Sequence, residues 1–92
     1  MQMVMVDFRG DTLTFHIDAA GNLKQNTYTF DKGQVLADAV ILDDNDPGIQ
    51  PAVIVRSDTV ISLACVNAAG AGRYITYVHE KGWLDVKGKP LP

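Results

Sequence analysis

The chain has 92 residues, of which 47% are hydrophobic and 21% are charged, and its formal net charge is −3. These values are typical of a single globular domain and exclude an intrinsically disordered chain. The eight Lys and Arg residues are scattered and form no basic stripe, so we expect no nucleic-acid partner.

The amino-terminal stretch MQMVMVDF lacks the positively charged segment that opens a signal peptide. No apolar run approaches the roughly 20 residues that span a bilayer, so we expect no membrane partner. The single cysteine, Cys65, excludes an internal disulfide, and its apolar neighbours predict a buried, inert thiol. We therefore expect a cytoplasmic or virion-associated protein. Secretion would require an export signal that has been removed.

Turn signals recur along the chain, and the segments between them are rich in Val, Ile, Thr, Tyr and Phe, as in an all-β sandwich or barrel. The segment 33–44 has apolar residues too dense to separate a strand from a short helix. The preceding DKG turn and the β-branched pair Val40 and Ile41 favour a strand. The expected antiparallel strands are 3–8, 11–18, 23–30, 34–42, 52–56, 59–66, 73–79 and 83–87.

Two similar stretches, TYTFDKG at 27–33 and TYVHEKG at 76–82, indicate an internal repeat. Each stretch suits the end of a strand followed by a turn that Gly closes at positive φ. We therefore expect the two stretches to form the same hairpin, with Tyr28 and Tyr77 on equivalent faces.

The repeat extends over residues 9–33 and 56–82, where ten of 25 aligned positions are identical once a two-residue insertion is allowed. We place the insertion between Leu13 and Asp18, inside a strand. Two added residues preserve the alternation of side chains between the faces of a strand, whereas one would reverse it. The RGD sequence at 9–11 becomes a repeated tight turn, because Arg-Ser-Asp stands at the matching corner.

The repeat predicts the domain organisation. Residues 1–92 form one domain of two tandem four-stranded units, about 1–46 and 52–92, with a linker at 43–51. A pseudo-two-fold axis should relate the units within an eight-stranded barrel or sandwich.

Segment 59–66 has apolar residues on both faces, and Tyr74 and Tyr77 alternate between the faces of the next strand. One small core covers only one face of a strand. Either loops or a subunit interface must cover the second face, and we expect an interface. The main expected partner is therefore a second copy of the chain, with another protein as a further candidate.

The linker sequence DDNDPG places Asp43, Asp44 and Asp46 close together, and carboxylate oxygens are ligands that calcium prefers. Their spacing does not match a calcium-binding EF-hand loop, and a solvated Pro-Gly turn explains the same residues. His16 and His79 have none of the spacings of a zinc site. We expect no metal and no cofactor, with His16 on the polar face of its strand.

The turn EKGW at 80–83 and its match DKGQ at 31–34 each precede the last expected strand of a four-stranded unit. This layout resembles the short bacterial lectins whose two blades trimerise into a six-bladed propeller. The resemblance implies two propeller-like blades completed by oligomerisation, and a carbohydrate partner. The Arg, Glu and Trp that bind fucose in that family have no equivalent set in either repeat, so the sugar site does not carry over.

These patterns predict a non-catalytic protein-binding or assembly module, such as a structural subunit, an adaptor or an inhibitor. The alternative is a lectin-like carbohydrate-binding module, and a small enzyme with an unrecognised site is third. The candidate binding-surface residues are Trp83, Tyr74, Tyr77 and His16.

Overall fold

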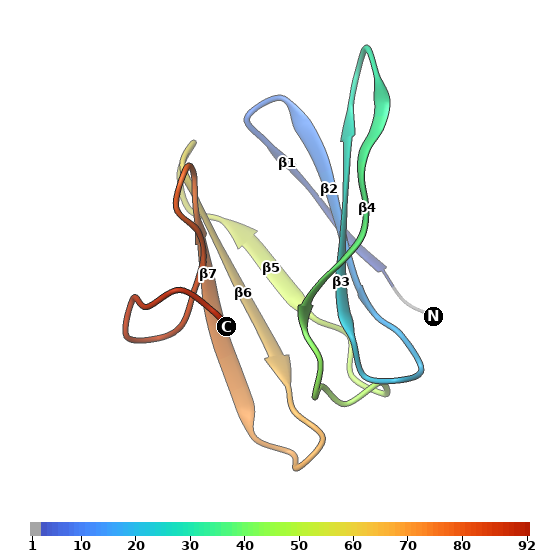
Figure 1. Ribbon diagram of the computed structural model, residues 1–92, viewed down its shortest axis with the longest axis vertical. Helices are drawn as coiled ribbons and strands as arrows, with labels where there is room; N and C mark the ends of the chain where they lie inside the picture. The colour runs from blue at the N-terminus through green and yellow to red at the C-terminus, as the bar shows by residue number, and fades with distance from the viewer. Residues whose placement is uncertain (1–2) are drawn as a thin grey trace.

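The computed structural model describes residues 3–92 and shows an all-β protein (Figure 1). Within these residues no helix is present, and so none that could cross a membrane. All eight predicted strands are confirmed, and the ambiguous segment after Gly33 is a strand. The strands are β1 (Met3–Phe8), β2 (Asp11–Ile17), β3 (Leu23–Thr29), β4 (Gly33–Leu42), β5 (Ala52–Val55), β6 (Val60–Val66), β7 (Gly72–Val78) and β8 (Gly82–Leu84).

The strands form two antiparallel four-stranded sheets, ordered β1-β2-β3-β4 and β5-β6-β7-β8. Within each sheet, every strand pairs with its neighbours in sequence, because short turns join them. The sheets do not close into a barrel, so the barrel expected as one possibility is not formed. The connection from β4 to β5 instead carries the chain from the first sheet to the second.

The two sheets pack in a sandwich-like arrangement that is narrow at one side. β1 and β5 lie close together across the two sheets, while β4 and β8 are the strands at the far margins. Figure 1 shows β4 and β7 well separated on the two sides of the molecule. The core between the sheets contains Phe8, Leu13, Phe15, Ile17, Leu23, Ile61, Leu63, Cys65 and Ile75.

Residues on the central strands alternate between the core and the outer surface, as the two-residue period of a strand requires. In β2 and β3 the paired residues Phe15 and Gln25 face inward, and in β6 and β7 the paired residues Leu63 and Ile75 do so. The inward positions carry odd numbers in both sheets. Even-numbered residues of these strands form the two outer faces.

The two units match strand by strand at one offset. β2 begins at Asp11 and β6 at Val60, while β3 begins at Leu23 and β7 at Gly72, so both pairs are offset by 49 residues. The insertion expected inside β2 is therefore misplaced. The length difference lies in the turns, because Phe8 pairs with Asp11 across a two-residue turn whereas the loop after Val55 is longer.

An odd offset aligns inward positions of one unit with outward positions of the other. Tyr28 lies on the outer surface of the first sheet, whereas Tyr77 packs against the core and makes an edge contact with Phe8. The two tyrosines therefore hold matching positions on the same face of their units, as the repeat predicted. That face points outward in the first sheet and inward in the second, so only Tyr77 is covered.

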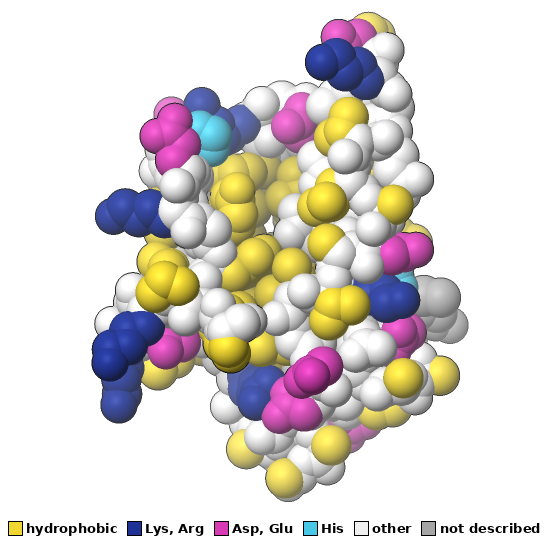
Figure 2. Space-filling model, in the orientation of Figure 1, with side chains coloured by type: hydrophobic (Ala, Val, Ile, Leu, Met, Phe, Trp, Pro, Cys, Tyr) yellow, Lys and Arg dark blue, Asp and Glu magenta, His cyan; other side chains and the backbone are white. Residues whose placement is uncertain are grey.

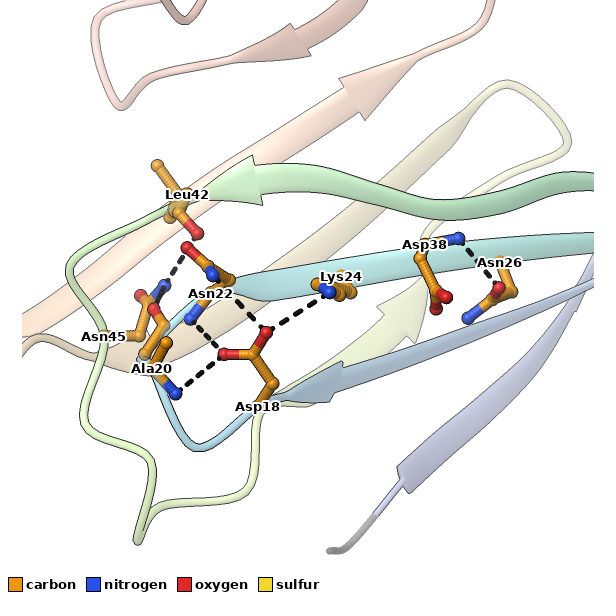
Figure 3. A network of polar contacts seen from close by, with 9 residues as sticks. Asp18, Ala20, Asn22, Lys24, Asn26, Asp38, Leu42 and Asn45 are labelled. Atoms are coloured by element: carbon orange, nitrogen blue, oxygen red, sulfur yellow. Dashed lines mark hydrogen bonds and ion pairs between the residues drawn. The ribbon is translucent and has the colours of Figure 1, made fainter.

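The β2–β3 and β6–β7 loops have the same backbone hydrogen bonds. The N–H of Gly21 donates to the carbonyl of Asp18, and the N–H of Gly70 donates to that of Asn67. Gly21 and Gly70 both adopt positive φ, a conformation that glycine reaches without the steric cost of a Cβ. In the first loop the Asp18 carboxylate also accepts hydrogen bonds from the N–H groups of Ala20 and Asn22, and pairs with Lys24 (Figure 3).

This geometry makes the first loop sensitive to acid. Hydrogen bonds from Asn22 lower the pKa of Asp18 from its ordinary value of 3.8 to about 2. Since the folded-state pKa is depressed, the stabilisation is complete above pH 3.8 and is lost as the pH falls toward 2. We expect the Asn22 amide to lose hydrogen-exchange protection over this range. The equivalent Ala71 amide, held by the uncharged Asn67, should not respond, and NMR of both amides and of the Asp18 carboxyl measures the difference.

The matched control for the acid response is Asp18→Asn. This variant gives the first loop the side chain of the second, so the pH dependence at Asn22 should disappear. Equal acid sensitivity in both loops would contradict the assignment to Asp18.

The linker between the sheets binds both units through Asn45, whose side chain is buried. Its Nδ2 donates to the carbonyls of Gly21 and Leu42 (Figure 3). Its Oδ1 accepts from the thiol of Cys65 at 3.1 Å. All three partners come from different segments, so Asn45 fixes how the linker leaves the first sheet and meets the second.

Candidate assembly surface

The second-sheet outer face is apolar and exposed. It consists of outward residues of β5, β6 and β7, namely Ala52, Ile54, Ser62, Ala64, Val66 and Tyr74. Ile54 is 51% exposed and Tyr74 is 41% exposed. Shallow hollows on this face are lined by Ala52, Ala64 and Tyr74, together with Ile49 and Val86 at its margin. Contiguous apolar surface of this kind is rare on monomeric proteins.

A polar cluster lies within this face. Arg56 Nε donates to Ser62 Oγ at 3.0 Å, and Ser62 Oγ lies 2.7 Å from the hydroxyl of Tyr74. The hydrogen bond with Ser62, assisted by Arg56, lowers the pKa of Tyr74. The cluster holds the Tyr74 ring across β6 and provides hydrogen-bonding groups on an otherwise apolar face.

The first-sheet outer face has a different composition. Its methionines are strongly exposed, and it consists of Met3, Met5, Asp7, Thr12, Thr14, His16, Lys24, Asn26 and Tyr28. His16 lies on this outward side, as expected from its strand, but only 8% of it is exposed, so it offers little surface to a partner. Among residues 3–92, Thr14 Oγ1 and His16 Nδ1 are buried without a hydrogen-bond partner.

Trp83 and Tyr77 lie between the sheets. The Trp83 indole packs edge-on against Phe15 and Tyr77, with ring centroids 5.7 and 5.4 Å apart, and its Nε1 donates to Gln25 Oε1 at 3.1 Å. The structure therefore separates the candidate aromatic residues, since Tyr74 alone of these three lies on an outer face. In the space-filling view, apolar side chains occupy the hollow between the sheets (Figure 2).

A small cavity opens at the end of this hollow, beside the β1–β2 turn. It has a volume of ≈ 230 Å³, and Phe8, Leu13 and Tyr77 form its apolar wall. Its polar lining consists of Arg9, Asp11, Gln25, Thr27 and His79.

The linker carboxylates have separate roles. Asp44 forms a two-fold ion pair with Arg73, and Asp46 Oδ1 accepts the N–H of Gly48 at 2.8 Å. In the part of the chain that the structure describes, no group of three or more His, Cys, Asp or Glu side chains is placed to hold a metal ion.

Cys65 is buried beside Asn45, which confirms the prediction of a buried thiol. Burial raises the pKa of this thiol, which disfavours the reactive thiolate. Cys65 therefore has a structural position between the sheets.

The two halves of the chain differ in charge. Residues 1–46 contain eight acidic and three basic side chains, whereas residues 47–92 contain three acidic and five basic ones. Their net charges are −5 and +2. Three of the acidic residues, Asp43, Asp44 and Asp46, belong to the linker that follows the first sheet.

No protein-family model matches the chain, and the searches of curated proteins and of solved structures found no significant match.

Proposed function

We propose that this chain is a non-catalytic assembly module that associates with further copies of itself. The observation that carries the proposal is the exposed second-sheet outer face, where Ile54, Ala64 and Tyr74 form apolar surface over the three strands of greatest length in that sheet. Burial of such surface is the main driving force for protein association, at roughly 25 cal/mol per Å². A structural subunit is the role that fits best.

The proposal includes the origin of the two sheets. The shared offset of 49 residues, the equal loops at Gly21 and Gly70 and the equal turns at Gly33 and Gly82 support duplication of one four-stranded unit. Because the two units are similar, the contact between the sheets of one chain can be repeated between chains.

Self-association is tested by light scattering across a dilution series. We expect a mass above the 10.0 kDa of one chain at micromolar concentration, decreasing on dilution. Ala64→Arg should abolish association, because an unpaired charge buried in an interface costs about 3 kcal/mol or more. Ala64 is exposed on its strand, so the variant should still fold.

The control for this experiment is Leu36→Arg. Leu36 is also an exposed apolar residue, but it pairs with Thr27 on the inward side of β4, away from both outer faces. This variant should associate as the unchanged chain does. A constant mass of 10.0 kDa for the unchanged chain at every concentration would contradict the proposal.

A further inference from the structure

The contact between the two sheets joins faces that are not equivalent. At the offset of 49 residues, inward Phe15 aligns with outward Ala64, and inward Leu63 aligns with outward Thr14. We name the face that carries Phe15 or Ala64 the front of a unit, and the face that carries Leu63 or Thr14 its back. The core is therefore formed by the front of the first unit and the back of the second.

This arrangement leaves one front and one back uncovered within a single chain. The free front is the second-sheet outer face, and the free back is the first-sheet outer face. We infer that the free front of one copy packs on the free back of the next copy and so repeats the front-to-back contact between chains. This inference rests on the proposed function and names its partner surfaces.

The two free faces are complementary in chemistry. The free back carries Met3 and Met5, whose apolar side chains match Ile54 and Ala64 on the free front. It also carries Thr14 and His16, which occupy the places that Leu63 and Cys65 hold in the second unit. Both of these side chains are buried, at 6% and 8% exposure. The free front presents the Tyr74 ring, which is 41% exposed, and the exposed Arg56, both hydrogen-bonded to the buried Ser62.

The contact uses two different faces, so each added copy again offers a free front and a free back. Such a contact forms a ring where the rotation between copies closes and an open filament where it does not. Because β1 and β5 meet at the narrow side of the chain, these strands would line the centre, with β4 and β8 at the rim. Radial arrays of four-stranded sheets close with about four to eight sheets, which corresponds to about two to four copies of this chain.

Two variants that each block one face test the inference. Ala64→Arg blocks the front and Met5→Arg blocks the back, at a position that is 69% exposed and should tolerate the change. Each variant alone should weaken self-association by about 100-fold or more, because every front-to-back contact needs both faces. An equimolar mixture should form a heterodimer of about twice the 10.0 kDa chain mass and nothing larger, measured by light scattering and native mass spectrometry.

The other outcomes overturn the inference in distinguishable ways. If Met5→Arg associates like the unchanged chain while Ala64→Arg does not, two fronts pair and the proposed self-association stands without the ring. If both variants are monomeric and their mixture also stays monomeric, the contact is not front-to-back. If the unchanged chain is monomeric, the proposed function fails as well. Circular dichroism of each variant verifies that it is folded.

Discussion

Gly21→Ala is expected to destabilise the fold far more than the matched substitution Gly70→Ala. Both glycines have nearly the same left-handed backbone, with φ of +86° and +87°. A side chain in this conformation costs about 1–2 kcal/mol. At Gly21 an added Cβ would lie 2.6 Å from the backbone carbonyl oxygen of Asn45, whereas at Gly70 no atom lies within 4 Å. Relief of this overlap should cost about 1–3 kcal/mol more.

The measurement is urea unfolding of both variants at one fixed protein concentration, since self-association makes apparent stability depend on concentration. The difference between the variants isolates the contact with the linker, because their backbone strain cancels. Equal losses of stability would show that Asn45 does not hold the linker against the β2–β3 loop. A larger loss for Gly70→Ala would contradict the packing of the loops directly.

The strands could be predicted from the sequence because local chemistry determines them. Positive φ is needed at Gly21, Gly33, Gly70 and Gly82, and these glycines mark the turns. The pairing of the sheets depends on contacts between distant residues. Whether eight consecutive strands close into a barrel or divide into two sheets is decided by the path of the linker and by the contacts of Asn45, which no local pattern reveals.

The candidate surface was predictable only in part. Alternation in β7 showed that Tyr74 and Tyr77 point to opposite sides, but both sides of β6 are apolar, so the pattern could not tell which side faces the core. The first sheet determines which side of the second sheet is covered, since its inward residues Phe8 and Phe15 pack against Tyr77 and Trp83. Because both faces of β6 are apolar, we expected a subunit interface to cover the face that does not pack against the core. That interface remains a prediction about the oligomer.

Trp83→Ala is expected to lower the free energy of unfolding by about 3 kcal/mol, near the lower end for removal of a large aromatic side chain, because Trp83 is half-buried. The substitution removes the edge contacts with Phe15 and Tyr77 and leaves the buried Gln25 without its indole donor. Urea unfolding monitored by circular dichroism measures the loss. This result would place Trp83 in the structure of the inter-sheet core, since a surface aromatic used for sugar stacking could be removed at little cost in stability.

The matched variant Trp83→Phe separates packing from hydrogen bonding. Phenylalanine keeps an aromatic ring beside Phe15 but cannot donate to Gln25 Oε1, so we expect a loss of about 1–2 kcal/mol, the usual cost of an unsatisfied buried acceptor. Trp83 lies on neither outer face, so Trp83→Phe should retain the mass of the unchanged chain in light scattering. Unchanged stability in Trp83→Ala, together with loss of binding on a glycan array, would contradict this account and favour a carbohydrate-binding role for the indole.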